Sequence, residues 1–387
     1  MSIRHPHIRF QYEPLDIENF REAECDNGAK MEGITNPDVL KIWDVFHSTS
    51  LKRAFAWADR HQKDALDKTY VIDTDDGYDL EAYNEVKPDF ILNKRSLNEV
   101  PHINLLLGKA NEALADGGYL LCHARTATLE RELILHTYPL VIRRLKTAWV
   151  YFWHRVCPKM PLIKRLYFKI TDGRHRSFHR IEMMGRMCRA GFQIVDEEFI
   201  HGEFFVIGRK VREPKWDEEP KCGPVIKLKR VGKDGKYIGV YKFRTMYSYS
   251  EYLQDYLYLH GGLQEGGKFK EDCRINFWGK WMRPIWLDEL PMLINWIKGQ
   301  MKLVGVRPLS QQYFNLYTPE MRALRIKVKP GLIPPFYYDR ISPKTIEDVQ
   351  ASERKYIEAY LKHPLRTDIK YFWGTIGNIL FRHKHSN

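Results

Sequence analysis

The chain of 387 residues has no uninterrupted apolar run near the length of a membrane span, and its first residues form no apolar signal-peptide core. We therefore expect a cytoplasmic chain whose contact with a membrane is peripheral. Cysteine is also scarce, with six scattered residues and no Cys-x-x-Cys pair. This pattern excludes a disulfide framework and a cysteine zinc site, and it is typical of a reducing cytosol.

Acidic residues are outnumbered, which gives a net charge of +13 and favours a negatively charged partner. The excess is concentrated in residues 141–180, where Asp172 is the only acid among eleven lysines and arginines. Tryptophan and tyrosine are interleaved with these cations, as in helices at the level of lipid headgroups. We expect an anionic membrane surface as partner rather than nucleic acid. A helix with an aromatic core side and a solvated basic side is the alternative.

A second uncharged, aromatic stretch lies at residues 371–381 and is followed by basic residues. It is too short to cross a bilayer, so it either lies in the membrane interface or packs in a core. Core packing is the simpler expectation.

Two adjacent carboxylates, Asp288 and Glu289, are predicted to lie in the first turn of a helix. Apolar residues recur at the helical spacing i, i+3, i+4 and i+7, and Gly299 marks the stop. These apolar residues are Leu290, Leu293, Ile294 and Ile297. The positive end of a helix favours ionised carboxylates, and such a group can act as a nucleophile or a magnesium ligand. Asp288 could equally be a plain helix cap.

Arginines at positions 274, 283 and 307 surround this pair in the sequence and suggest chemistry on phosphate. Five motifs around the pair resemble, in order, those of the bacterial sugar transferases, the monotopic polyprenyl-phosphate phosphoglycosyl transferases. The motifs are Gly223-Pro224-Val225 with residues 230–236, Tyr241-Lys242-Phe243-Arg244-Thr245-Met246, Leu287-Asp288-Glu289-Leu290-Pro291, residues 303–308 and Lys329-Pro330-Gly331-Leu332. The resemblance covers roughly residues 222–381.

The resemblance implies transfer of a sugar 1-phosphate from a nucleotide diphosphate sugar to polyprenyl phosphate, the initiating step of cell-surface polysaccharide assembly. Asp288 matches the family's nucleophilic aspartate, and Glu289 matches its acid that binds Mg²⁺. Arg244, Arg307, Arg274, Arg283 and Lys242 are the expected phosphate-binding residues.

Two departures from the family's pattern stand out. An apolar helix that enters the membrane and bends back normally precedes Gly223, but here residues 213–220 form a polar, proline-flanked stretch. In addition, Val306 stands where the family usually has proline before the arginine. Without the re-entrant helix, we expect a peripheral protein at the cytoplasmic face of the inner membrane, or in the cytoplasm.

The sequence pattern of the N-terminal half predicts an α/β layered domain, because short apolar strands alternate with helices such as 103–114. Residues 104–120 and 190–206 look like the second half of a class I methyltransferase fold. The glycine-rich loop needed beside that family's cofactor is absent. Asp73, Asp75 and Asp76 could mimic the family's acidic contact with the cofactor, but an acidic surface loop is the simpler interpretation. We expect a degenerate module that positions or recruits the transferase.

We therefore expect a methyltransferase-like α/β domain at 1–212, a linker at 213–221 and an α+β sugar-transferase domain at 222–387. Three functions remain open: an active phosphoglycosyl transferase, a non-catalytic scaffolding or binding protein of a polysaccharide assembly system, and a methyltransferase with an accessory tail. The complete Asp288-Glu289 pair favours the first, and the missing membrane helix favours the second.

Overall fold

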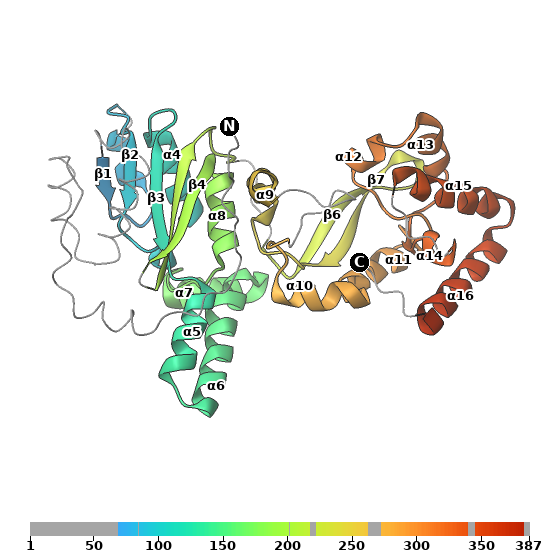
Figure 1. Ribbon diagram of the computed structural model, residues 1–387, viewed down its shortest axis with the longest axis horizontal. Coiled ribbons are helices and arrows are strands. Elements are labelled where there is room, and N and C mark those ends of the chain that lie inside the picture. Colours follow the sequence, from blue (N-terminus) through green and yellow to red (C-terminus); the bar gives the residue numbers. More distant parts are fainter. Residues whose placement is uncertain are drawn as a thin grey trace, which may run out of the picture. The chain divides into compact units, whose positions relative to one another are not determined.

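A computed structural model of the chain describes most of the sequence from residue 69 onward. The described residues are 69–83, 85–200, 202–216, 222–261, 272–339 and 345–382. They form two compact units, each of which combines helices with strands (Figure 1). The first unit ends at Cys222 but also includes 247–261, whereas the second contains 223–246 and the described residues from 272 onward. The domain limits predicted from the sequence placed residues 247–261 in the second domain. The structure corrects this limit, because these residues pack in the first unit. Residues 1–68 and part of the predicted linker, 217–221, lie outside the described residues.

The first unit is built on a five-stranded sheet in the order β1-β2-β3-β5-β4. The strands are β1 (Thr69–Ile72), β2 (Phe90–Asn93), β3 (Tyr119–Ala124), β4 (Phe192–Ile200) and β5 (Glu203–Lys210). The first three strands are parallel, while β5 is antiparallel to both β3 and β4. Every side chain of β2 is buried, which explains why the sequence shows a continuous apolar run there rather than alternation. The predicted strands of the N-terminal half are thus confirmed.

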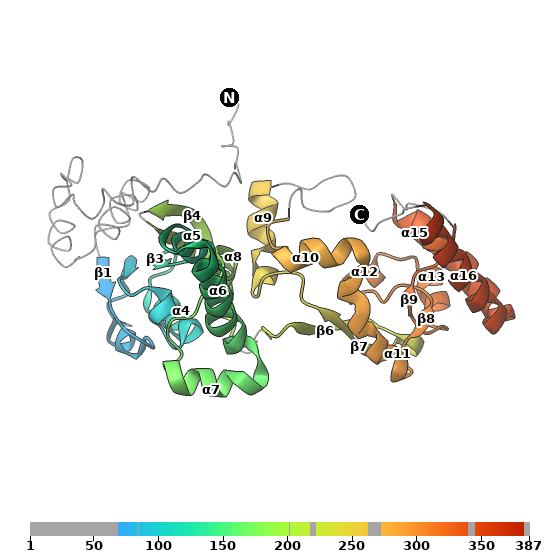
Figure 2. The same cartoon turned by 90° about the horizontal axis from the view of Figure 1, so that it is seen from below.

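The first unit also contains helices, some of which cover the sheet. They are α4 (Ile103–Ala113), α5 (Ala127–Thr137), α6 (Leu140–Val150), α7 (Pro161–Thr171), α8 (Arg180–Arg189) and α9 (Gln254–Gly261). Helix α8 packs against β4 and β5 and is buried over most of its length. Helices α5 and α6 form a pair that extends away from the sheet (Figure 1), and seen from below they lie side by side (Figure 2). Short 3₁₀ and π turns complete the connections at Tyr78–Tyr83, Leu97–Glu99, Tyr151–Val156 and Cys157–Lys159.

Residues 247–261 pack with the first unit through α8. The turn Ser250–Leu253 lies against this helix, and Gly185 faces the backbone of Tyr249. The Arg186 guanidinium lies over the Tyr249 ring and donates hydrogen bonds to its hydroxyl and to Asn104. Two residues earlier in the chain, the ring of Tyr247 stacks on that of His179, with 4.0 Å between the ring centres. The segment is therefore bound to the first unit by both close packing and a buried polar network.

The second unit begins with an antiparallel hairpin of β6 (Val225–Val231) and β7 (Tyr237–Phe243), as the sequence predicts. Asp234 and Gly235 both have positive φ in the connecting turn Lys233–Gly235, which matches the conformation of a tight hairpin turn. A second small sheet pairs β8 (Lys302–Val304) with β9 (Gly331–Ile333) in parallel. Gly305 and Gly331 allow this pairing, because a Cβ on Gly331 would lie 2.2 Å from the Gly305 nitrogen.

The remaining helices of the second unit surround these sheets. They are α10 (Phe277–Met282), α11 (Leu293–Ile297), α12 (Gln311–Asn315), α13 (Pro319–Arg325), α14 (Phe336–Asp339), α15 (Ile346–Lys362) and α16 (Pro364–Arg382), with 3₁₀ turns at Arg283–Ile285 and Leu287–Met292. A core cluster joins Tyr356 of α15 to Tyr371 of α16 and to Val304 of β8. The aromatic C-terminal stretch thus packs partly in a core, although Trp373 is exposed.

The contact at Gly185 yields a test of the fold. A Cβ at this position would lie 2.2 Å from the backbone oxygen of Tyr249, which cannot move aside like a flexible side chain. We predict that Gly185→Ala destabilises the first unit by about 1–3 kcal/mol despite its better helix propensity. Urea unfolding followed by circular dichroism measures the change. Gly377→Ala in α16 is the control, because nothing lies within 4 Å of its added methyl group. Equal stability of Gly185→Ala and wild type would contradict the close packing.

Candidate functional site

The carboxylate pair lies in the 3₁₀ turn Leu287–Met292, directly before α11. The sequence predicted one continuous helix; instead a 3₁₀ turn leads into a short α-helix, and Gly299 with φ 67° follows it as the expected stop. Trp286 precedes the turn in a left-handed conformation and donates to the hydroxyl of Tyr337. Both Asp288 and Glu289 are partly buried.

The apolar stripe that predicted this helix is not buried. Leu290, Leu293, Ile294 and Ile297 are all exposed, and the buried residues of the segment are Pro291, Met292 and Asn295. Nearby in the sequence, α10 and the turn after it expose more large apolar side chains. These are Phe277, Trp278, Trp281 and Ile285. The second unit therefore presents apolar groups on the same segments that carry the carboxylate pair.

Asn295 holds this segment against β7. Its side-chain oxygen accepts from the Tyr241 amide at 3.0 Å, and its nitrogen donates to the Gly239 carbonyl and the Gln300 side chain, each at 2.8 Å. Because Lys242 follows Tyr241 on the same strand, these bonds fix the spacing between Lys242 and the carboxylate pair.

Glu289 contacts two of the predicted phosphate-binding cations. The Lys242 ammonium lies 2.6 Å from Glu289 Oε1, and the Arg307 guanidinium lies 3.5 Å from the same oxygen. These three residues line a cavity of about 100 Å³ together with Arg230. The backbone of Arg307 is held in turn by Arg325, which is itself paired with the buried Glu353.

Electrostatics at Asp288 reflect a balance of opposing causes. Burial raises its pKa, the Lys242 ammonium lowers it, Glu289 raises it and Arg283 lowers it, with a net pKa above the ordinary value. A carboxylate that binds a proton more tightly is also the stronger base and nucleophile when ionised. Asp288 thus combines a more basic carboxyl group with two cations that favour its charged form.

The other predicted arginines have different roles in the structure. Arg283 donates to the Thr245 hydroxyl at 3.0 Å and contributes to the field at Asp288, and burial lowers its own pKa. Arg244 donates through Nε to the Gly223 carbonyl at 3.0 Å. Arg274 forms a two-pronged contact with Asp272 at 2.8 Å, so part of its charge is already balanced. The structure thus brings Lys242 and Arg307 to Glu289, whereas phosphate binding by Lys242 and by each of these arginines stays a prediction.

Arg230 was not among the predicted site residues, although it stands in a recognised motif. It lines the same cavity, and burial together with Arg307 lowers its pKa. Arg230 lies on β6 opposite Ile238 of β7, and its place at the cavity depends on how this hairpin packs, which the sequence motif does not reveal.

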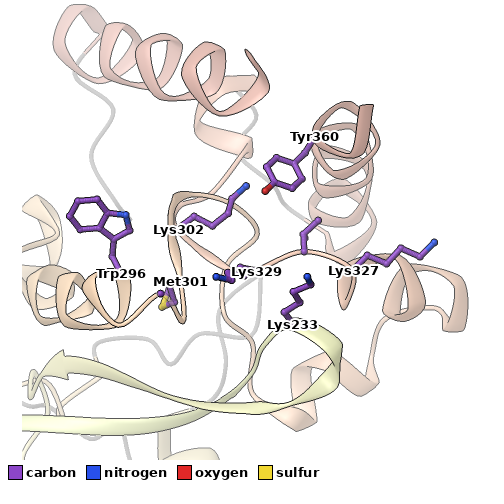
Figure 3. Close-up of a pocket in the computed structure, with 9 residues that line it drawn as sticks. Lys233, Trp296, Met301, Lys302, Lys327, Lys329 and Tyr360 are labelled. Atoms are coloured by element: carbon purple, nitrogen blue, oxygen red, sulfur yellow. The ribbon is translucent and has the colours of Figure 1, made fainter. Parts of the chain in front are cut away.

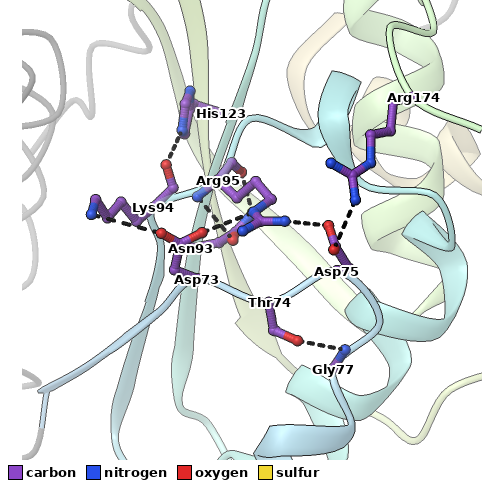
Figure 4. A network of polar contacts seen from close by, with 9 residues as sticks. All are labelled: Asp73, Thr74, Asp75, Gly77, Asn93, Lys94, Arg95, His123 and Arg174. Carbon is purple, nitrogen blue, oxygen red and sulfur yellow. Dashed lines mark hydrogen bonds and ion pairs between the residues drawn. The ribbon is translucent and has the colours of Figure 1, made fainter. Parts of the chain in front are cut away.

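The carboxyl ends of β1 and β2 are the usual place for a ligand in an α/β sheet. Here ion pairs fill that place (Figure 4). The Arg95 guanidinium contacts Asp73 at 2.8 Å and also Asp75, which accepts from Arg174 at 3.2 Å. The acidic loop considered as a cofactor contact is therefore engaged by the protein's own arginines.

Comparison with known proteins bears on the second unit. The sequence model of the family described as bacterial sugar transferase matches residues 217–382. A curated relative, the "Uncharacterized sugar transferase EpsL" of Bacillus subtilis, is 37% identical over 29% of this chain and 50% of its own. The "UDP-galactose-lipid carrier transferase" of Erwinia amylovora is 33% identical over 41% of this chain and 34% of its own.

A third relative, the "UDP-glucose:undecaprenyl-phosphate glucose-1-phosphate transferase" of Klebsiella pneumoniae, is 39% identical over 28% of this chain and 22% of its own. The chain thus spans half or less of the length of these relatives. A solved O-methyltransferase family 2 protein from Planctomyces limnophilus covers 32% of this chain and 31% of its own with 19% identity and a TM-score of 0.19, which is too low to support an argument.

The balance at Asp288 can be tested by titration. Replacing Lys242 by methionine removes the largest cause that lowers the pKa of Asp288, so we predict a further rise of that pKa. Carboxyl ¹³C NMR of Asp288 against pH measures it. Lys298→Met is the control, because it removes an exposed cation that does not act on Asp288. An unchanged or lowered pKa in Lys242→Met would contradict the assigned balance.

Proposed function

We propose a function from the premise that the C-terminal half of the chain belongs to the bacterial sugar transferase family. The protein transfers a sugar 1-phosphate from a nucleotide diphosphate sugar to polyprenyl phosphate and so initiates assembly of a cell-surface polysaccharide. The observation that carries this proposal is the Asp288-Glu289 pair with Lys242 and Arg307 on Glu289, inside the matched segment. Curated relatives of that segment are named for UDP-sugars and undecaprenyl phosphate.

Asp288 is the proposed nucleophile. A carboxylate oxygen of Asp288 attacks the phosphorus that bears the sugar, and the bond to the bridging oxygen breaks. The nucleoside monophosphate leaves with that bond's electron pair. A phosphate oxygen of polyprenyl phosphate then attacks the same phosphorus and releases the Asp288 carboxylate. Arginine and lysine side chains in the cavity stabilise the negative charge on the phosphate oxygens in both steps.

Magnesium fits the donor set only together with substrate. The described residues contain no group of three or more acidic, histidine or cysteine side chains arranged for a metal. Magnesium, however, often binds one or two carboxylates and takes its other ligands from phosphates and waters. Glu289 would supply such a carboxylate, and the ion would neutralise charge on the diphosphate. The Lys242 ammonium lies 2.6 Å from Glu289, so it would have to move partly away from this carboxylate for the metal to bind.

The nucleophile assignment predicts the effect of one substitution. Asp288→Asn keeps the size and hydrogen-bonding shape of the side chain but cannot form the acyl phosphate, so turnover should fall by about a thousandfold or more. Release of nucleoside monophosphate from nucleotide diphosphate sugars, with polyprenyl phosphate and magnesium present, measures it. Asp234→Asn is the matched control, since asparagine tolerates the left-handed turn at this exposed position. Comparable release by wild type and Asp288→Asn would refute the assignment and favour the scaffolding alternative.

The acceptor is a membrane lipid, so the site must approach a bilayer. No helix within the described ranges has the length and apolarity to cross one. We propose that the exposed apolar side chains beside the carboxylate pair contact lipid, with Trp281 68% and Ile297 78% exposed. Lipid contact would place Asp288 at the depth of the polyprenyl phosphate headgroup.

A second membrane contact is proposed on the first unit, on the cytoplasmic face of the inner membrane. Helix α6 has no buried residue, and Val141, Leu145 and Trp149 are 59–70% exposed. Helix α7 adds exposed cations beside exposed Leu166 and Ile170. The basic segment predicted at residues 141–180 is thereby narrowed to residues 141–170. Its last three arginines make internal contacts instead: Arg174 with Asp75, Arg176 with two backbone carbonyls and Arg180 with Glu197.

Vesicle binding tests this contact. Reversing four exposed cations of the segment should abolish salt-sensitive binding to anionic vesicles, because each contributes on the order of 1 kcal/mol near an anionic surface. The four are Arg144, Lys164, Arg165 and Lys169. The control reverses four exposed cations elsewhere, namely Lys236, Arg354, Lys362 and Arg366. Sedimentation with phosphatidylglycerol vesicles gives the readout. Equal loss in both variants would show an effect of net charge alone, and no loss in the first would rule the segment out.

The first unit is proposed to be a methyltransferase-like module that positions the transferase rather than transferring methyl groups. Residues 247–261 pack within this unit and directly follow Arg244, Thr245 and Met246 in the chain. Thr245 accepts a hydrogen bond from Arg283, which in turn lowers the pKa of Asp288. A shift of residues 247–261 would therefore move Thr245 and disturb the position of Arg283. The Gly185→Ala variant should therefore also lower turnover, whereas Gly377→Ala should not.

A further inference from the structure

A second cavity of the second unit, about 370 Å³ in volume, is lined by four lysines. Lys233 comes from the hairpin turn, Lys302 from β8, and Lys327 and Lys329 from the stretch between α13 and β9. The other lining residues are Trp296, Gly299, Met301, Val328 and Tyr360. None of the residues around the Glu289 cavity is among them, so the two cavities are separate.

The segments that carry these lysines are fixed to one another through their backbones. The amide of Asp234, next to Lys233, donates to the Ile326 carbonyl at 2.8 Å. The amide of Lys302 donates to the Pro330 carbonyl at 2.9 Å. The cations are therefore gathered by the fold and are not a chance meeting of flexible loops. Figure 3 shows Lys233, Lys302 and Lys329 around the space below Tyr360, whereas the side chain of Lys327 extends to one side of it.

Most of this positive charge is not paired with a carboxylate in the part of the chain that the structure describes. Lys302 contacts Asp368 at 3.0 Å and lies 3.2 Å from the centre of the Tyr360 ring. For Lys233, Lys327 and Lys329, the described part of the chain offers no ion pair with the side chain, and all three are exposed. Four like charges around one cavity repel one another, and among the described residues only the Asp368 carboxylate offsets them. An anion with several charges would relieve this repulsion.

The neutral lining indicates more than a simple ion. Met301 and Val328 are buried, and Trp296 presents an aromatic ring that is 44% exposed. The cavity is large enough for a small ligand, and an aromatic ring beside cations suits a base joined to phosphates. We propose that this cavity binds a diphosphate group, either free inorganic diphosphate or the diphosphate of a nucleotide. The proposal does not depend on the transferase activity.

Calorimetry tests it on the full chain. All titrations use the Arg307→Ala background, so that the cavity beside Glu289 contributes little to the signal. Changing Lys233, Lys327 and Lys329 to alanine should weaken inorganic diphosphate binding by about tenfold or more, since each loses a charged hydrogen-bond donor. These side chains are exposed, so the fold should tolerate the change. The control changes three other exposed lysines, Lys236, Lys280 and Lys362, to alanine.

The outcomes separate the alternatives. Weaker binding in the first variant and near-wild-type binding in the control supports the site, whereas equal affinities in the two variants overturn it. Absence of diphosphate binding in the background protein also overturns it. A comparison of uridine diphosphate with inorganic diphosphate then identifies the source. If the nucleotide binds more tightly and Trp296→Ala removes that advantage, the site takes nucleotides; equal affinities assign it to free diphosphate.

Discussion

The buried side-chain amide of Asn295 is the interaction on which the geometry of the carboxylate pair depends. It is fully buried and bonds to the backbone of β7 on both sides of its amide group. Loss of such a group would leave buried backbone donors and acceptors unpaired, at about 1–3 kcal/mol for each. The 3₁₀ turn before it contains Pro291 and lacks a side-chain cap, so its position comes from these tertiary bonds. Lys242 can therefore meet Glu289 although 47 residues separate them.

The first unit relies on a different constraint, a buried carboxylate. Glu182 is almost completely buried between Lys159 at 2.5 Å and Arg186 at 3.1 Å. Burial alone would raise its pKa, but these cations outweigh burial and hold the pKa at about 2. Arg186 then extends the network to Tyr249. A charge buried without these partners would be strongly destabilising, so the network specifies one arrangement of α8 and the segment 247–253.

The chain passes from the second unit back to the first before it returns, and each unit contains one of these two constraints. The stretch between Met246 and residue 272 interrupts the second unit in the sequence. Its described part, residues 247–261, packs with the first unit. In the sequence, Arg244 and Thr245 precede this stretch, and Arg274 and Arg283 follow it. The first unit thus holds residues 247–261, which directly follow Met246 in the chain.

Local patterns in the sequence were enough to determine the strands, the β6–β7 hairpin and the motifs of the second unit. Apolar runs, Asp-Gly turns and phosphate-binding residue types express short-range chemistry that each segment carries by itself. The sequence likewise singled out Asp288 and Glu289 together with Lys242 and Arg307, which the fold brings to Glu289, while the chemical roles of these residues stay predictions. It did not reveal Arg230, the lysine cavity or the exposure of Leu290 and Ile297. Those features depend on which segments meet across long separations, and burial and hydrogen bonding decide that only in the folded chain.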